Sequence, residues 1–396
     1  QLPEQLVNQI AAGEVVERPA AAVKELVENA LDAGARTISI DVDGGGRRAI
    51  RVVDDGTGMD ADDARLALTR HATSKLRAFD DLVTLATMGF RGEALPSIAA
   101  VSRLTLTTRT AETVAAHRLT VEASQITGER EAGAPVGTQI EVRDLLFNVP
   151  ARLKFIKGDA TEVGHVTDAL LRLGLAFPKV HLRLRVNGKV NLDLPPHGTE
   201  LERAQAALSS RGRGQGALQL YRGEAVAGEL RATAYLAAPE DSAGSPRLTY
   251  LYVNRRYVRD RSLLHSLALG FGEVLPKGRY PLGVLLIDMP GDAVDINVHP
   301  QKLEVRFRDA QGVYKAVRDA VRPLVAQAPW LLGPQRGKHT TVSAELFFGD
   351  AAGGGAPEVG ETAEVGDAPE ASDARPDYGA SEGVSEISED EVRRPP

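Results

Sequence analysis

Residues 19–33 read PAAAVKELVENALDA, and this stretch decides the fold prediction. Pro19 suits the first turn of a helix, and Gly34, directly after the stretch, suits the position just beyond a helix end. Glu25 and Asn29 stand four residues apart, so they share one side of that helix. Apolar residues recur at helical spacing on another side: Val23, Leu26, Val27, Ala30 and Leu31. The pattern predicts an amphipathic helix whose apolar side packs against other elements.

Strand patterns follow this helix. Residues 38–42 alternate apolar and polar side chains, residues 44–46 are three glycines that predict a turn, and residues 50–52 resume the alternation. Further alternating runs lie at 104–106, 138–142 and 182–186, the last of them before an Asn187-Gly188 hairpin turn. We therefore predict an α+β fold, a two-layer sandwich with helices on one face of a largely antiparallel sheet.

A second α+β unit is predicted after a break at Pro195–Thr199. Its expected strands are Glu229–Ala237, Leu248–Val253, Leu282–Ile287 and Leu303–Phe307, and its expected helices are Ser262–Gly270 and Gln311–Ala326. Residues 209–216 read as a flexible basic insert. We place domain boundaries at residues 1–200 and 201–332, with a tail over residues 333–396.

Charge is spread unevenly along the chain. The 396 residues carry a net charge of −7, which by itself argues against a nucleic-acid partner. Residues 350–396 hold 13 acidic and 3 basic residues, which leaves 44 basic against 41 acidic residues in 1–349, a net charge of +3. The end of the chain is also poor in large apolar residues, so we predict a disordered acidic tail behind a mildly basic body.

Composition excludes several classes of site. The absence of cysteine excludes disulfides, thiol catalysis, cysteine-bound zinc and iron–sulfur clusters. No apolar run reaches 18 residues, and the first ten residues lack the basic and apolar regions of a secretory signal, so neither a membrane span nor a leader is expected.

A glycine motif follows the second predicted strand. Residues 56–61 match the G-x-G-x-x-A pattern of dinucleotide-binding folds, but Asp54 and Asp55 stand just before it and would repel a pyrophosphate. A carboxylate at a strand end can instead accept a hydrogen bond from the exocyclic amine of adenine. Gly56 and Gly58 would then let the backbone approach a flat base. The alternative is an ordinary Asp-Gly turn.

The polar side of the first helix suits phosphate chemistry. Asn29 offers an oxygen ligand of the kind that Mg²⁺ takes, and Glu25 can deprotonate a water that attacks a phosphate. Asp32 lies close to the same side. Taken alone, this pattern is also that of a solvated helix surface.

Two further segments suit an anion site. They are Thr73, Ser74 and Lys75, and then Gly89, Phe90, Arg91, Gly92, Glu93, Ala94 and Leu95. The second combines a Gly-x-x-Gly spacing with an arginine before a short helical run, which offers N–H groups and a cation to a phosphate. The glycines also suit a mobile lid, and the alternative is a structural loop.

In order and spacing these motifs closely resemble the MutL family of DNA mismatch-repair proteins over about residues 1–330. The matching runs are 8–16 (NQIAAGEVV), 24–29 (KELVEN), 54–58 (DDGTG), 70–75 (RHATSK), 89–95 (GFRGEAL), 137–138 (GT), 147–155 (FNVPARLKF) and 297–307 (NVHPQKLEVRF).

The resemblance implies an ATPase domain of the superfamily shared with gyrase B, the Hsp90 chaperones and sensor histidine kinases, followed by a ribosomal S5-like domain. By this resemblance Glu25 is the general base and Asn29 the Mg²⁺ ligand. Asp54 binds the adenine amine, with Thr138 nearby, and Gly56 and Gly58 flank the base. Thr73–Lys75 and Gly89–Leu95 form the lid over the phosphates, Lys302 contacts the γ-phosphate, and Arg261 contacts DNA. For Arg261 a surface salt bridge is the alternative.

The function implied by the resemblance is a slow, Mg²⁺-dependent ATPase switch of mismatch repair. ATP would drive N-terminal dimerisation into a homodimeric clamp on DNA, in the bacterial cytoplasm at the nucleoid and with no membrane partner. A MutS-type mismatch sensor and a downstream repair nuclease or helicase are the implied protein partners. The D-Q-H-A-x-x-E endonuclease motif of the family is absent, so the chain is expected to be an N-terminal ATPase fragment.

Two other function classes were weighed. A histidine kinase of the same superfamily needs a phosphoacceptor histidine on a preceding helix, and no histidine precedes Glu25. A DNA-binding scaffold with an inactive nucleotide site is the non-enzymatic alternative, and the presence of Glu25, Asn29 and Lys302 argues against it.

Overall fold

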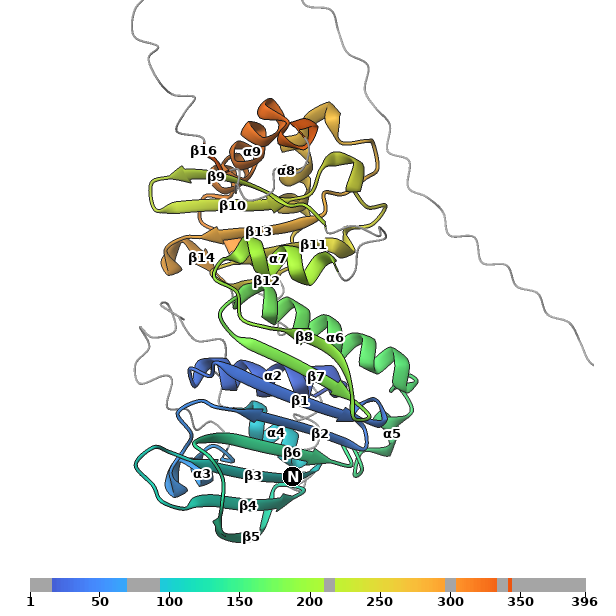
Figure 1. The fold of residues 1–396 in the computed structure, drawn as a ribbon. Helices are drawn as coiled ribbons and strands as arrows, with labels where there is room; N and C mark the ends of the chain where they lie inside the picture. The colour runs from blue at the N-terminus through green and yellow to red at the C-terminus, as the bar shows by residue number, and fades with distance from the viewer. Residues whose placement is uncertain (1–15, 70–92, 210–217, 296–303, 333–340, 344–396) are drawn as a thin grey trace, which may run out of the picture. The chain divides into compact units, whose positions relative to one another are not determined.

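The predicted first helix is present as α2, Pro19–Asp32, in the computed structural model (Figure 1). Gly34 follows it with φ +75°, and the N–H groups of Gly34 and Ala35 donate to the carbonyls of Leu31 and Ala30. This is the double hydrogen bond that ends many helices at a left-handed glycine. The model describes residues 16–69, 93–209, 218–295, 304–332 and 341–343.

The first sheet has eight strands in the order β5-β4-β3-β6-β2-β1-β7-β8. Their bounds are β1 Thr37–Asp43, β2 Ala49–Asp54, β3 Arg103–Arg109, β4 Ala116–Glu122, β5 Gln125–Ala132, β6 Gly137–Arg143, β7 His181–Val186 and β8 Lys189–Leu194. Neighbours are antiparallel except for β1 and β7. The largely antiparallel sheet is thus confirmed, and it excludes a dinucleotide fold at β2, whose two neighbours are both antiparallel.

Helices cover one face of this sheet, as predicted (Figure 1). They include α2, α4 (Ala94–Ala100) and α6 (Asp159–Ala176). The sandwich core joins apolar residues of the helices, such as Val23 and Leu170, with strand residues such as Ile40 and Leu106, all of them buried. Three shorter elements complete this part: α3 (Ala61–Leu66), α5 (Pro150–Leu153) and the 3-10 turn η1 (Gly44–Gly46).

The second sheet has six strands in the order β12-β11-β13-β10-β9-β16. Their bounds are β9 Tyr221–Ala227, β10 Leu230–Leu236, β11 Thr249–Val253, β12 Arg256–Val258, β13 Gly283–Asp288 and β16 Thr341–Ser343. The helices α8 (Arg261–Phe271) and α9 (Ala310–Gln327) confirm the two predicted ones, and their buried residues join those of the sheet in a second core. Of the predicted strand Leu303–Phe307, only β15 (Arg306–Phe307) is present, paired with β14 (Val294–Asp295), and Leu303 lies outside the described residues.

The segment Pro195–Thr199 joins β8 to α7 (Glu200–Ser209). Ser209, which we expected in the basic insert, is the last residue of α7, and residues 210–216 lie outside the description. Residues 1–349 form one compact unit, so the domain boundary near residue 200 stays a prediction. The predicted tail lies outside the described residues apart from β16. Among the helices that the structure describes, none has the length and apolar character that a membrane crossing requires.

Arg203 of α7 is fully buried and supports the strand connection before β7. Its Nη2 donates to the carbonyls of Pro178 (2.7 Å) and Val180 (2.6 Å), and burial lowers its pKa to about 10. We expect Arg203→Met to lower the free energy of unfolding by about 2–4 kcal/mol, because two buried carbonyls lose their charged donor. Urea denaturation measures this loss. Arg322→Met, at an exposed arginine of α9, should change the value by less than about 0.5 kcal/mol, and equal effects of the two variants would contradict the role of Arg203.

Candidate active site

Asp54 is the last residue of β2 and lies opposite Thr138 of β6. Its Oδ1 accepts hydrogen bonds from the backbone N–H groups of Gly56 (2.9 Å) and Thr138 (3.3 Å). Burial raises the pKa of Asp54, and these two N–H groups oppose the rise only in part. The structure therefore brings together the two residues expected at an adenine, and it fixes the orientation of the carboxylate from the loop after β2 and from β6.

The neighbouring Asp55 has a different task. Its Oδ1 accepts from the backbone N–H groups of Arg36 (2.7 Å) and Thr37 (2.8 Å), at the start of β1. The side chain of Asp55 thus holds the connection between α2 and β1. Of the two consecutive aspartates, the structure makes Asp54 the candidate for ligand binding.

The loop after β2 packs closely on its surroundings. Gly58 has φ +70°, and a Cβ added there would lie 2.0 Å from the carbonyl oxygen of Arg109. A Cβ added to Gly56 would lie 2.9 Å from the Cβ of Ala33, and the Thr57 N–H donates to the Ala33 carbonyl (3.1 Å). Glycine is required here because the backbone passes against β3 and the end of α2 with no room for a side chain.

Two threonines join the loop to the sheet. The hydroxyl of Thr108 lies 3.1 Å from the hydroxyl of Thr138 and accepts from the N–H of Met59 (2.9 Å). Thr108 is buried on β3. Sequence reasoning missed Thr108. It lies opposite Thr138 on the neighbouring strand β3, a pairing that becomes visible only in the folded sheet.

Glu25 and Asn29 are both half-buried on α2, while Val23, Leu26 and Ala30 are in the core. The predicted division of this helix into an apolar and a polar side is therefore confirmed. The described residues hold no group of three or more His, Cys, Asp or Glu side chains arranged for a metal ion. Asn29 offers one amide oxygen, and Mg²⁺ at phosphate-transfer sites commonly takes further ligands from phosphates and waters.

Sequence reasoning also missed two charged neighbours of Glu25. The Lys24 Nζ lies 2.9 Å from Glu25 Oε1 and 2.8 Å from Glu28 Oε2. Burial alone would lower the pKa of Lys24, but the carboxylates of Glu25 and Glu28 outweigh it and raise that pKa above its ordinary value. The Lys24–Glu28 spacing of four residues is the sequence signal that could have revealed this cluster.

The predicted lid is described only at its end. Glu93 is the N-cap residue of α4, Ala94 begins the helix, and Leu95 is buried in the core. Thr73, Ser74, Lys75, Gly89, Phe90, Arg91 and Gly92 lie outside the described residues, and so does Lys302.

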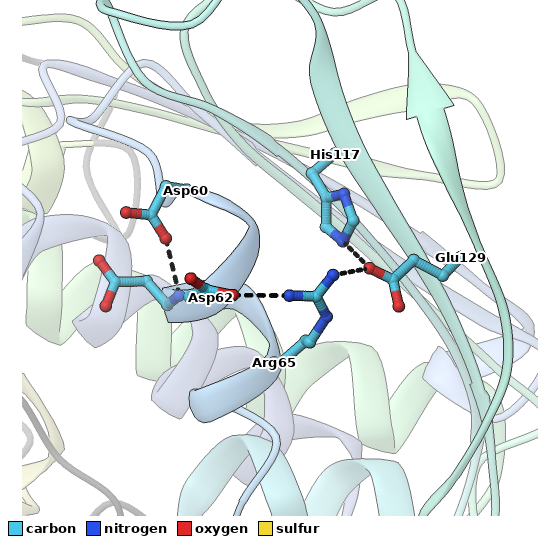
Figure 2. Close-up of polar contacts among 6 residues, drawn as sticks. Asp60, Asp62, Arg65, His117 and Glu129 are labelled. Atoms are coloured by element: carbon cyan, nitrogen blue, oxygen red, sulfur yellow. Dashed lines mark hydrogen bonds and ion pairs between the residues drawn. The ribbon is translucent and has the colours of Figure 1, made fainter.

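The helix α3, which precedes that segment, is fixed to the hairpin of β4 and β5 (Figure 2). Arg65 pairs with Asp62 (2.6 Å) and with Glu129 of β5, and His117 Nε2 of β4 lies 3.0 Å from the same Glu129 carboxylate. Asp60 caps the helix by accepting from the Asp63 N–H (2.8 Å). The hydrogen bond from Arg65 is the main cause that lowers the pKa of Glu129. Sequence reasoning did not predict this cluster, which anchors the chain beyond Gly58 to the sheet.

Arg261 is the first residue of α8 and is exposed, and Asp260 caps this helix by accepting from the Leu263 N–H (2.8 Å). Both the DNA contact and the salt-bridge alternative for Arg261 stay predictions. No described contact joins it to the site on α2.

Comparisons with known proteins agree with this geometry. The family model "Histidine kinase-, DNA gyrase B-, and HSP90-like ATPase" matches residues 17–147, and "DNA mismatch repair protein, C-terminal domain" matches residues 217–326. The DNA mismatch repair protein MutL of Anaeromyxobacter dehalogenans is 50% identical over 330 residues, which cover 83% of this chain and 54% of that protein. The chain thus spans about half the length of the curated relatives it matches.

Solved structures show the same fold. The Aquifex aeolicus MutL ATPase domain complexed with ADP is 29% identical with a TM-score of 0.53, covering 70% of this chain and 93% of that one. The N-terminal domain of a DNA repair protein, 22% identical, gives a TM-score of 0.69 and covers 82% of this chain and 99% of that one, a likeness of fold alone.

Proposed function

The chain belongs to the MutL family of DNA mismatch-repair proteins, and from that premise we propose that its first sheet binds ATP and hydrolyses it slowly to ADP and phosphate. One observation carries the proposal. The glycine loop donates to the Asp54 carboxylate through the Gly56 N–H and to the Ala33 carbonyl, at the end of α2, through the Thr57 N–H, and α2 carries Glu25 and Asn29. Groups suited to bind a purine, a metal-bound phosphate and an attacking water are therefore joined through α2 and the loop bonded to its end.

Each residue has one role in the proposed reaction. Asp54 accepts a hydrogen bond from the adenine amine, and the backbone at Gly56 and Gly58 passes along the base. Asn29 holds Mg²⁺ together with the phosphates, and the ion neutralises phosphate charge when it is bound. Glu25 accepts a proton from the attacking water. The water oxygen forms a bond to the γ-phosphorus as the bond to the leaving ADP oxygen breaks.

Other parts of the chain complete the switch in this proposal. Thr73–Lys75 and Gly89–Leu95 close over the phosphates, and Lys302 contacts the γ-phosphate. A cation that contacts the group lost on hydrolysis makes the arrangement of the chain depend on the state of the nucleotide.

The proposed consequence of ATP binding is N-terminal dimerisation, which makes a homodimeric clamp on DNA. The mildly basic body with Arg261 contacts phosphates without reading sequence. A MutS-type mismatch sensor would act before the clamp, and a repair nuclease or helicase after it, in the bacterial cytoplasm.

The test is an ATPase assay with and without single-stranded DNA over a series of salt concentrations. We expect slow basal turnover and a stimulation by DNA that falls steeply as salt rises, because phosphate contacts release counterions. Arg261→Gln should flatten this salt dependence, while Arg322→Gln, at an exposed arginine of α9, should leave it unchanged. Absence of ATP turnover, or stimulation that is independent of salt, would contradict the proposal.

A further inference from the structure

The ammonium group of Lys24 joins two carboxylates of α2. It lies 2.9 Å from Glu25 Oε1 and 2.8 Å from Glu28 Oε2. Consecutive residues of a helix do not face each other, so the contact between Lys24 and Glu25 is not a default of helix geometry. It requires the Lys24 side chain to lie along the helix, between an adjacent residue and one a turn further on.

Glu28 is the buried member of this cluster, with 4% of its surface exposed. A buried carboxylate needs countercharges, and Glu28 has them from two elements. One is Lys24 on α2 and the other is Arg256 on β12, itself 7% exposed. Burial lowers the pKa of Arg256, while the carboxylates of Glu28, Asp32 and Glu25, in that order, act against this.

The cluster therefore differs from a surface ion pair. An exposed Lys–acid pair at a spacing of four residues contributes little to stability. Here a half-buried lysine, with 34% of its side chain exposed, is shared between a buried carboxylate and the carboxylate of the proposed general base, so the position of Glu28 limits where Lys24, and through it Glu25, can lie.

We propose that Lys24 is a positioning residue for Glu25, held in place by the buried Glu28. The inference rests on the proposed role of Glu25 as the general base. Lys24 restricts the Glu25 carboxylate to one arrangement and favours its ionised form, which is the form that accepts a proton.

The test compares steady-state ATP hydrolysis over pH with the binding of a non-hydrolysable ATP analogue. Lys24→Met should lower kcat about tenfold or more and move the acidic limb of the kcat profile to higher pH, while the analogue Kd changes less than about threefold. Lys24→Arg should restore most of kcat. The matched control is Lys315→Met, which removes a Lys–Asp319 pair of the same spacing and length (2.8 Å) on α9 and should leave kcat, Kd and the pH profile unchanged.

Two further variants keep the outcomes distinct. Glu28→Gln removes a negative charge beside Glu25 and leaves Lys24 to Glu25 alone, so it should move the acidic limb to lower pH, opposite to Lys24→Met. Lys24→Gln replaces Lys24→Met if the latter does not fold. In a Glu25→Gln background, Lys24→Met should cause no further loss, because both act through one group. Unchanged kcat in Lys24→Met, or a parallel loss of kcat, analogue binding and urea midpoint, overturns the positioning role alone. Full turnover in Glu25→Gln overturns the general base itself, and the positioning role with it.

Discussion

Glu25→Ala is expected to bind ATP normally and to lose hydrolysis by about 10²–10⁴-fold, the usual contribution of a positioned general base. The side chain is half-buried on α2 and pairs with Lys24, while the proposed adenine contacts Asp54 and Thr138 lie on β2 and β6, so its loss should not disturb base recognition. Single-turnover hydrolysis and equilibrium ATP binding measure the two properties separately.

A matched acid on another helix provides the control for this result. Asp319→Ala removes a carboxylate from α9 that is likewise paired with a lysine, and it should leave turnover unchanged. Wild-type turnover in Glu25→Ala would show that another group accepts the proton.

Asp54→Asn is expected to weaken ATP binding by about 10- to 100-fold, which corresponds to the loss of a hydrogen bond to a charged acceptor. The amide oxygen can still accept from the N–H groups of Gly56 and Thr138, so the loop should keep its shape. The amide nitrogen, however, would face the adenine amine with a second donor. The same nitrogen suits the O6 acceptor of guanine, so the preference for ATP over GTP should narrow.

Asp55→Asn is the control for this selectivity, because it changes the next residue in the same way. Its carboxylate serves only the N–H groups of Arg36 and Thr37 in the described contacts, and an amide oxygen can take over both hydrogen bonds. Titrations of both variants with ATP and GTP separate the two positions. Equal losses for Asp54→Asn and Asp55→Asn would mean that the turn, and not recognition of the base, sets the affinity.

The sequence pattern was sufficient to predict α2, because residues typical of helix ends mark both of its ends and its apolar and polar residues are spaced on separate sides. Pro19 begins it, Gly34 follows its end with φ +75°, and the apolar positions are buried as their spacing predicts, except that Leu31 is only partly buried. The glycine turn after β2 was likewise predicted from its residue types. The pairing of Asp54 with Thr138 could not follow from local pattern, because it joins strands 84 residues apart. Thr138 was predicted as a site residue only from the resemblance to the MutL family.

The sequence pattern did not predict two elements of the first sandwich, strand β5 and helix α6. Every residue of β5 except the last, Ala132, is exposed, so no alternation of apolar and polar side chains marks it, and it is held by pairing with β4. The helix α6 contains Gly174, which weakens helical preference. The structure gives the reason for that glycine: an added Cβ would lie 2.5 Å from a methyl carbon of Leu194. Contacts with distant parts of the chain, strand pairing for β5 and side-chain packing for α6, therefore stabilise both elements.

The bond between the Thr57 N–H and the Ala33 carbonyl makes α2 a spacer of fixed length. Glu25 precedes Ala33 by eight residues, a rise of about 12 Å, and no flexible segment interrupts the helix between them. Adding or removing one residue there would turn Glu25 and Asn29 by about 100° relative to the glycine loop. The length of α2 between Glu25 and Ala33 thus sets the distance between the proposed general base and the proposed adenine site, and a change of that length by a single residue would separate the two.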